Sequence, residues 1–564
     1  MSPLQRFDLD DSKTIDDVEL NRRWTAFHRS TRSTSSNPIR RIGGALLKED
    51  SARYRAVRRV VSPWLGRDHV KATSPGSDPH SMRDETSAFP TNFIMDQDPP
   101  SPPSLPRETR REVLVLVLDE NHAECDTIVE NLNLSLRATE ATWIMLVDSS
   151  TTGDERDIAL RALLARADAG IDVVYADETG PISVQPVLKP AAIGPHTLLS
   201  YNVVGRPALI RTTTLLSIEG FRRDAGWAFE HDAYLRILEN GGRFVHVAKV
   251  LPAGRPDVAF HAEHIDVATL HATSSALARR GWKGSVDVAT VTGVSHWRLD
   301  VPSPAPSIDV VMPTRDRIDL VRRCLQSIER STYPNYDVII VDNDSVEPES
   351  IEFFNTTQYR VVRSPGAFNY AKIVNQGVEH STADFVITLN NDTFVLSADW
   401  LEQMVALASL DDVGVVGVCL LDRTGAHEHD GFVISPYPQH LRMGSNYPLQ
   451  DQYTAATRDV IAVTGAAQMV NRLFWKQLGG MDEQLRVVMN DVDLCLRSQL
   501  NGRHVVFCPD VQIFHYAGSS RGSLDPIEDR NRFIRRWDIF GTFEDPYVPE
   551  SIDLYGNSFI YRYR

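Results

Sequence analysis

Runs of apolar residues alternate with amphipathic stretches along most of this chain, beginning after residue 111. The first runs are VLVLVL (113–118), ATWIMLVDSS (141–150) and GIDVVYADE (170–178). Between the last two lies DERDIALRALLARA (154–167), where apolar positions recur at helical spacing. Short apolar runs separated by helices are typical of an α/β fold with a largely parallel sheet. We therefore expect that fold class here.

The alternation starts again after a proline-rich joint, VPSPAPS (301–307). The expected strands are IDVVMP (308–313), YDVIIVDND (336–344), TQYRVVRS (357–364) and DFVITLNND (384–392). The expected helices are RIDLVRRCLQSIERS (317–331) and YAKIVNQGVEHS (370–381). This strand–helix–strand–strand–helix–strand order is typical of a nucleotide-binding α/β half. We predict two tandem domains with mixed, mainly parallel sheets, in residues 111–300 and 307–545, and a tail at 546–564.

The first 110 residues have a different composition, rich in Ser, Pro, Arg and Asp, with stretches such as STRSTSSNP and DQDPPSPPSLP. Such segments bury too little apolar surface to offset the entropy of ordering, so we expect a mostly flexible segment. Within it, SARYRAVRRVVSPWL (51–65) predicts a short basic helix that Pro63 ends. Such a helix can contact an anionic membrane surface; a solvated or partner-binding helix is the alternative.

Chain length, net charge and cysteine count limit the class of protein. A chain of 564 residues is too long for one ordinary core, and its net charge of -16 argues against non-specific nucleic-acid binding. The five cysteines are scattered and form no CxxC pair, so neither a disulfide framework nor a zinc knuckle is indicated. No apolar run is long enough to span a bilayer, and the N-terminus lacks the apolar core of a signal peptide. We expect a cytoplasmic protein.

Polar side chains gather at the ends of the expected strands in the second half. Thr314 and Arg315 follow the first strand, Asp342 ends the second, and Asn391 and Asp392 follow DFVITL. Parallel strands end at one edge of a sheet, so these residues should converge. A carboxylate at the second strand can accept a hydrogen bond from a nucleobase or ribose, and one at the later strand can hold a divalent cation against a diphosphate. The alternative for each is a capped turn.

Further chemistry-bearing residues come later in the chain. Asp491 and Asp493 open an expected helix, where the helix dipole favours acidic side chains whatever their role. The functional interpretation is a general base held at a rigid helix start. His515 ends the run VQIFH, and a histidine there is either a satisfied buried residue or a ligand to a metal or phosphate.

These motifs carry a resemblance. The segment from 307 to 522 resembles the catalytic domain of family 2 glycosyltransferases, which have the GT-A fold, and is most similar to the branch for O-antigen, rhamnan and other cell-surface polysaccharides. The matching stretches are IDVVMPTRDR, YDVIIVDND, GAFNYAKIVNQG, FVITLNNDTFV, DWLEQMV, VTGAAQMVNR, LGGMDE, MNDVDLCLR and HYAGSSRG. The resemblance implies transfer, with inversion, from a nucleotide-diphosphate sugar donor to a hydroxyl of a glycan, lipid-linked or protein acceptor.

The resemblance also implies roles for individual residues. NND stands at the Asp-X-Asp metal motif of the family, so Asp392 would bind Mn²⁺ or Mg²⁺, and His515 matches the late metal-binding histidine. Asn390 replaces the first carboxylate of that motif, which is a departure. Asp342 matches the acid that contacts the nucleobase, and Asp491 matches the catalytic base. The other residues expected to bind the donor are Thr314, Arg315, Asn369, Asn391, Thr464 and Gly465.

The first half resembles the same family more faintly. SIEGFRRDAGWAFEHDAYLRI echoes QLGGMDEQLRVVMNDVDLCLR, which places Glu230 opposite Asp491. VDSS puts Ser150 where the metal motif has its last carboxylate, and VLPAGR puts Ala253 where His515 stands. We therefore expect a divergent, inactive GT-A-like domain that packs against the catalytic half or helps to hold an extended acceptor.

Several alternatives stay open at this point. The first half could be a generic α/β accessory domain, or Asp177 and Glu178 could supply a relocated metal site. The whole chain could be a nucleotidyltransferase acting on sugar phosphates, although MPTRDRIDL lacks the glycine-rich loop that such an enzyme needs. A non-catalytic glycan-binding scaffold is the third possibility, and it predicts a damaged site in the second half.

Overall fold

The computed structural model describes residues 112–118, 124–179, 186–252, 258–435, 437–442, 451–516, 526–550, 552–555 and 558–561. The basic helix expected near residue 54, and Ala253, lie outside these residues. Within the described ranges, no helix is both long enough and apolar enough to cross a membrane.

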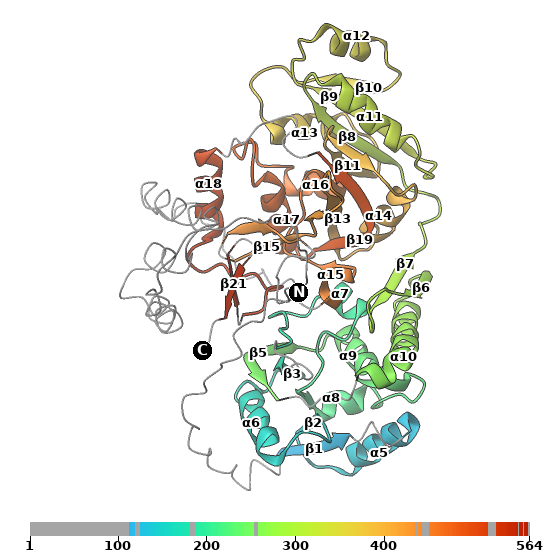
Figure 1. Cartoon of the computed structure of the whole chain (residues 1–564), viewed down its shortest axis with the longest axis vertical. Coiled ribbons are helices and arrows are strands. Elements are labelled where there is room, and N and C mark those ends of the chain that lie inside the picture. The colour runs from blue at the N-terminus through green and yellow to red at the C-terminus, as the bar shows by residue number, and fades with distance from the viewer. Residues whose placement is uncertain are drawn as a thin grey trace, which may run out of the picture.

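The first α/β unit, the lower one in Figure 1, is built on a five-stranded sheet in the order β1-β2-β4-β3-β5. The outer pairs, β1 with β2 and β3 with β5, are parallel, and β4 runs antiparallel to both of its neighbours. Its strands and helices are β1 (Val113–Leu118), α5 (Cys125–Ala138), β2 (Trp143–Asp148), α6 (Gly153–Leu164), β3 (Val173–Glu178), α7 (Pro195–Ser200), β4 (Ala208–Arg211), α8 (Thr212–Ser217), α9 (Phe229–Glu239), β5 (Phe244–Leu251) and α10 (Val258–Arg279).

The second unit, the upper one in Figure 1, has a ten-stranded sheet, reached through the hairpin β6 (Gly284–Val288) and β7 (Ser295–Leu299). Its main order is β10-β9-β8-β11-β18-β13-β19-β12, with β14 beside β13 and β17 beside β19. Its strands are β8 (Ile308–Thr314), β9 (Tyr336–Asp342), β10 (Arg360–Arg363), β11 (Phe385–Leu389), β12 (Thr393–Val395), β13 (Val413–Leu421), β14 (His427–His429), β17 (Arg458–Asp459), β18 (Ala467–Asn471) and β19 (His504–His515).

Helices flank this larger sheet, and two small hairpins lie outside it. The helices are α11 (Ile318–Ile328), α12 (Pro348–Thr356), α13 (Tyr370–Glu379), α14 (Trp400–Ala408), α15 (Asp451–Ala455), α16 (Arg472–Leu478), α17 (Asn490–Leu500) and α18 (Ile527–Trp537). The hairpins are β15 (Phe432–Ile434) with β16 (Pro438–His440), and β20 (Ile552–Tyr555) with β21 (Ser558–Tyr561).

Burial explains why apolar runs became strands. All residues of β8 and β11 are buried, because helices cover both faces of the sheet. The expected mixed α/β fold is confirmed. One expectation is wrong: α12 stands between β9 and β10, where no helix was expected. Pro348 at its first turn starts it, and only Ser350 and Phe354 of this nine-residue helix are buried, so its apolar pattern is weak.

The two units repeat one arrangement. The four strands β11-β18-β13-β19 have the same order and pairing directions as β2-β4-β3-β5. In both, a helix follows the antiparallel strand directly, α8 after β4 and α16 after β18. The first unit has one described strand beyond this set, β1, whereas the second continues through β8, β9 and β10.

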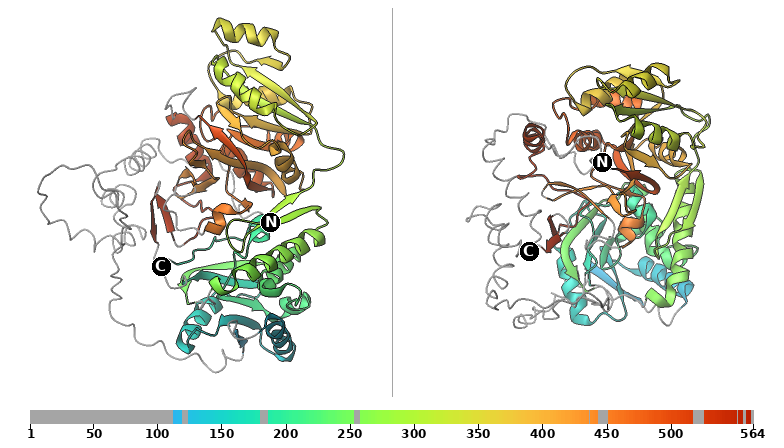
Figure 2. Two further views of the ribbon diagram at one scale, coloured as in Figure 1. Left: turned by 45° about the vertical axis from the view of Figure 1, so that its right-hand side comes forward. Right: turned by 45° about the horizontal axis from the view of Figure 1, so that its top comes forward.

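The units meet where α7 packs against β17. Figure 2 shows the two units from two further sides. Buried Asp459 accepts hydrogen bonds from the backbone N–H groups of His196 (2.9 Å) and Thr197 (3.0 Å), at the start of α7. Its other oxygen lies 2.8 Å from His196 Nδ1 and 3.2 Å from His504 Nδ1. One carboxylate of the second unit therefore caps a helix of the first.

Candidate functional site

A histidine and two carboxylates meet at one end of the large sheet. Thr393 pairs with His515 in the antiparallel register of β12 and β19, which brings the imidazole beside Asp392. His515 Nε2 lies 3.5 Å from Asp392 Oδ1, and His515 Nδ1 lies 3.2 Å from Glu428 Oε2. Burial lowers the pKa of His515, but its interactions with the carboxylates of Asp392 and Glu428 outweigh burial and raise that pKa to about 9.

This cluster fits a divalent cation. Asp392 is buried, and its Oδ1 has no hydrogen-bond partner in the structure although it faces His515. An orphaned buried carboxylate oxygen beside an imidazole nitrogen is a donor set that Mn²⁺ can use, and a carboxylate on the other ring nitrogen orients a ligating histidine. The residues that would hold Mn²⁺ or Mg²⁺ are therefore Asp392 and His515, with Glu428 behind the ring.

The expected base, Asp491, is half-buried at the start of α17. Its Oδ2 accepts a hydrogen bond of 2.8 Å from the Gly465 N–H. The Gly465 carbonyl in turn accepts from the Tyr370 hydroxyl at 2.8 Å, and that hydroxyl also lies 3.2 Å from Asn390 Oδ1. A Cβ on Gly465 would stand 3.3 Å from both Asp491 and Tyr370, so this close approach favours glycine.

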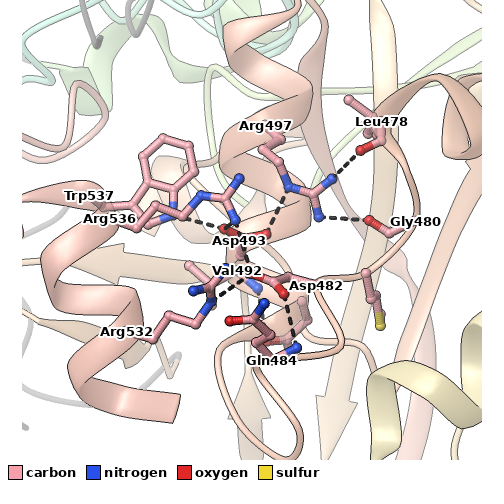
Figure 3. A network of polar contacts seen from close by, with 12 residues as sticks. Leu478, Gly480, Asp482, Gln484, Val492, Asp493, Arg497, Arg532, Arg536 and Trp537 are labelled. Carbon is pink, nitrogen blue, oxygen red and sulfur yellow. Dashed lines mark hydrogen bonds and ion pairs between the residues drawn. The ribbon is translucent and has the colours of Figure 1, made fainter. Parts of the chain in front are cut away.

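Asp493, two residues on, has a different environment (Figure 3). It is fully buried and accepts hydrogen bonds from Arg497 Nε (2.8 Å) and from the Trp537 indole N–H (3.0 Å) of α18. Arg497 also donates to the carbonyls of Leu478 and Gly480 (2.6 and 2.7 Å). Because its oxygens are saturated by structural donors, Asp493 anchors α17 and α18, whereas Asp491 faces the loop of Gly465.

Asp342 ends β9 as expected, but its carboxylate is fully buried. Ser345 donates to one of its oxygens from the backbone N–H (3.1 Å) and from the hydroxyl, and Arg363 at the end of β10 pairs with the other. The Arg363 side chain is 46% exposed. A ligand at this edge therefore meets the guanidinium of Arg363 before it meets the acid behind it.

The loop after β8 forms the adjacent rim. Thr314 Oγ1 accepts a hydrogen bond of 2.9 Å from Asn391 Nδ2, which joins the ends of β8 and β11. Asp316 Oδ1 accepts from the backbone N–H groups of Val346 and Glu347 (2.7 and 2.8 Å), so this loop is tied to the one after β9. Asp316 has φ of 54°, a left-handed conformation that non-glycine residues seldom adopt outside constrained sites.

The remaining residues expected to bind the nucleotide-sugar donor differ in exposure and in their contacts. Arg315 is exposed at the end of β8. Asn369 caps α13 through Lys372 N (3.0 Å) and donates to the Glu483 carbonyl (2.9 Å), so its amide holds backbone. Thr464 is buried beside Gly465, and its N–H donates to His429 Nε2 at 3.2 Å.

In the first unit, the place of the metal motif lacks its carboxylate. Trp143 of β2 pairs with Arg211, the last residue before α8, as Phe385 of β11 pairs with Asn471, the last residue before α16. With these pairs aligned, Ser150 takes the place of Asp392. The arginine network, by contrast, is repeated. Arg236 Nε donates to Asp232 (2.8 Å), and its Nη atoms donate to the carbonyls of Ile218 and Gly220, as Arg497 does in the second unit.

Glu230, at the position of Asp491, is held by a cation. Arg206 Nε lies 2.9 and 3.1 Å from its two oxygens, and both side chains are buried. A carboxylate in such an ion pair is a poor proton acceptor, since the cation stabilises its charged form.

The acids at the end of β3 are also engaged. Asp177 Oδ1 accepts from Lys189 N (2.8 Å) and lies 3.0 Å from His246 Nε2. Glu178 lies 3.7 Å from Lys189 Nζ. Burial lowers the pKa of Lys189 to about 7, although Asp177 and Glu230 favour its charged form. The Lys189 ammonium group therefore lies beside Glu178, one of the two acids that a relocated metal site would need.

Residues 309–464 match the family described as Glycosyl transferase family 2. The O-antigen biosynthesis protein RfbC of Myxococcus xanthus is 28% identical over 82% of this chain and 38% of its own length. The uncharacterized protein y4gI of Sinorhizobium fredii is 28% identical over 76% of this chain and 50% of its own. The chain thus spans half or less of these curated relatives.

Among solved structures, the mannosyltransferase PcManGT of Pyrobaculum calidifontis, in complex with GDP-Man and Mn²⁺, covers 39% of this chain and 59% of its own. It is 18% identical, with a TM-score of 0.31. The family model matches within the second half, inside the segment in which the resemblance was expected.

Glu428 and Arg363 are the site residues that the sequence did not reveal. Glu428 belongs to the short strand β14, and Arg363 ends the edge strand β10. The only signal in the sequence was the charged stretch HEHD, which has no strand-like alternation.

Proposed function

We propose that this chain is a metal-dependent inverting glycosyltransferase that moves a sugar from a nucleotide-diphosphate sugar to a hydroxyl group of an acceptor. One observation carries the proposal: Gly465 joins the two ends of the site. Its N–H holds Asp491 at 2.8 Å, and its carbonyl accepts from the Tyr370 hydroxyl that reaches Asn390, two residues before Asp392. The group that takes a proton and the group that holds a cation are thereby fixed relative to each other.

In the proposed reaction, Asp491 accepts the proton of the acceptor hydroxyl, because it is the half-buried acid of its pair and faces the loop of Gly465. The acceptor oxygen then attacks the anomeric carbon on the face opposite the nucleotide, so one displacement inverts the configuration. Asp392 and His515 would hold Mn²⁺ or Mg²⁺, which neutralises charge on a departing diphosphate when bound. No covalent enzyme nucleophile is required.

The nucleoside end of the donor is assigned to the rim after β8 and β9. Asp342 keeps Arg363 at this rim, where the exposed guanidinium can stack on or donate to a base or ribose. Thr314 and Asn391 keep the ends of β8 and β11 together beneath the diphosphate, and exposed Arg315 supplies a cation beside it. Asn369, Thr464 and Gly465 shape the sugar side.

We assign the first unit a supporting role, as a divergent and inactive GT-A-like domain. The repeated strand order and arginine network support common ancestry with the second unit, and Ser150 together with the Arg206–Glu230 pair argues against transfer there. The capping of α7 by Asp459 supports a fixed packing of the two units.

We also propose a place for the protein in cell-surface polysaccharide synthesis, on the cytoplasmic face of the membrane, with glycan, lipid-linked glycan or protein as acceptor. The match to the O-antigen biosynthesis protein supports this, and the basic stretch 51–65 is the segment proposed to contact anionic lipid. Liposome flotation that is identical with and without residues 1–75 would rule out that contact.

The test of the proposed activity is a donor screen. The purified chain is incubated with Mn²⁺ and a panel of nucleotide sugars, and released nucleoside diphosphate is measured. Release from one donor, abolished by EDTA, is expected. Release of pyrophosphate from a nucleoside triphosphate and a sugar phosphate would instead identify a nucleotidyltransferase. Turnover of neither kind with any donor or acceptor would favour a non-catalytic scaffold.

A further inference from the structure

We propose that Cys419, His427 and Asp430 form a second metal site, for Zn²⁺, separate from the cation site of Asp392. Cys419 lies near the end of β13, His427 begins β14, and Asp430 follows that strand. One potential ligand atom of each residue lies within 4.8 Å of the other two. Among the residues that the structure describes, no other group of three Cys, His, Asp or Glu side chains meets this criterion.

The geometry of the three side chains fits a tetrahedral ion. His427 Nδ1 lies 3.4 Å from Cys419 Sγ and 2.7 Å from Asp430 Oδ1. With zinc–sulfur and zinc–nitrogen bonds of ordinary length, adjacent ligand atoms of a tetrahedral site are about 3.3–3.6 Å apart, so only small shifts are needed.

The donor types select the metal. Thiolate and imidazole ligands favour Zn²⁺, while the carboxylate-rich cluster of Asp392 suits Mn²⁺ or Mg²⁺. A coordinated thiol is deprotonated by the ion itself, so Cys419 would bind the ion as a thiolate. With Cys419 and Asp430 charged and His427 neutral, the ligands carry two negative charges, which balance the two positive charges of Zn²⁺.

Access to the site is from the histidine side. Cys419 and Asp430 are buried, with 1% and 2% exposure, whereas the His427 side chain is 26% exposed. Three protein ligands with one open side leave room for water as the fourth ligand.

The Cys419, His427 and Asp430 site lies on the same hairpin as two residues that contact the transfer site. The β13–β14 hairpin presents successive side chains in different directions: His427 to the cluster, Glu428 to His515, and His429 to the Thr464 N–H. An ion at Cys419, His427 and Asp430 would close this hairpin and thereby fix the two neighbours of His427 that contact the transfer site. The metal-binding claim itself does not depend on the proposed activity.

The test uses the full chain, stripped with a chelator, and titrated with Co²⁺ as a spectroscopic probe for Zn²⁺. A thiolate-to-Co²⁺ charge-transfer band that grows to one equivalent and is bleached by Zn²⁺ is expected. Asp392→Ala should keep the band, because no cysteine belongs to the Asp392 cluster. The matched control Cys508→Ser should also keep it, since Cys508 is buried on β19 outside the group.

Cys419→Ser should abolish the band, and His427→Gln should weaken Zn²⁺ binding at least about tenfold. His427 is partly exposed, so its variant keeps the test valid even where Cys419→Ser fails to fold. Absence of the band in the wild-type chain, or its persistence in folded Cys419→Ser, would overturn the proposal and leave a hydrogen-bonded triad.

Discussion

Glu428 Oε2 lies 3.2 Å from His515 Nδ1, on the opposite side of the imidazole ring from Asp392. A carboxylate in this position fixes the ring orientation and makes the other nitrogen a better ligand. We therefore predict that Glu428→Gln weakens Mn²⁺ binding about 10–100-fold, measured by titration of the metal in the presence of nucleoside diphosphate. Glu352→Gln, at an exposed position on α12, is the matched control. Equal affinity in the two variants would remove Glu428 from the site.

Asp392 should be required for metal and donor together. Its unpartnered Oδ1 faces His515, and neighbouring Asn390 already accepts a hydrogen bond from Tyr370. Asp392→Ala is expected to lose Mn²⁺ binding and nucleoside-diphosphate release in parallel, whereas Asn390→Ala should retain metal affinity. Unchanged donor turnover by Asp392→Ala, or full activity of the wild type in EDTA, would contradict the assignment.

The first unit should be dispensable for chemistry. Glu230→Gln and Asp177→Asn, combined in one chain, remove the two acids that could serve a site there. Breaking the buried pair of Glu230 with Arg206 should cost about 3 kcal/mol of stability, so transfer is compared at equal folded fraction. Near wild-type transfer is expected. A loss as complete as that of Asp491→Asn in a folded double variant would show that the first unit catalyses.

The contact between the units should respond to pH. Burial disfavours the charged form of His196, but its contacts with Asp459 and Asp412 outweigh burial and raise its pKa above 6.5. Burial also disfavours the charged form of Asp459, but His196 and His504 outweigh burial and hold the pKa of Asp459 well below 3.8. A histidine whose pKa is raised by folding contributes its full stabilisation below pH 6.5. This contribution is lost as the pH rises through the pKa of the histidine in the folded protein. The stabilisation from Asp459 is present above pH 3.8 and is lost as the pH falls through the pKa of Asp459 in the folded protein.

The measurement is urea unfolding from pH 6 to pH 9 for the wild type and His196→Gln. The difference between their unfolding free energies is expected to shrink as the pH rises, because the wild type alone loses the charged pair. A difference that is constant over this range, or that grows, would show that His196 is not charged in the folded protein.

The sequence predicted where two acids stand relative to the strands. Asp342 ends β9 and Asp392 follows β11, and a parallel sheet brings such ends to one edge, so their placement required no tertiary information. The environment of each acid could not be predicted. Asp342 is covered by Arg363 from an edge strand, and Glu428 reaches His515 from a short strand without an apolar pattern. Only the folded chain brings these partners together.

The two acids of α17 look alike in sequence and differ in the structure. Asp493 is saturated by Arg497 and Trp537, so Asp493→Asn is expected to destabilise the fold by about 3 kcal/mol. Asp491 bonds the Gly465 N–H and faces the proposed acceptor, so Asp491→Asn should fold normally and bind donor.

The most direct test of the account is therefore the transfer rate of Asp491→Asn, measured together with its donor affinity in Mn²⁺. Loss of a general base predicts a rate reduced about 10²–10⁴-fold with unchanged donor affinity. Near wild-type transfer by Asp491→Asn, with folded Asp493→Asn inactive, would contradict the account and assign the base to Asp493.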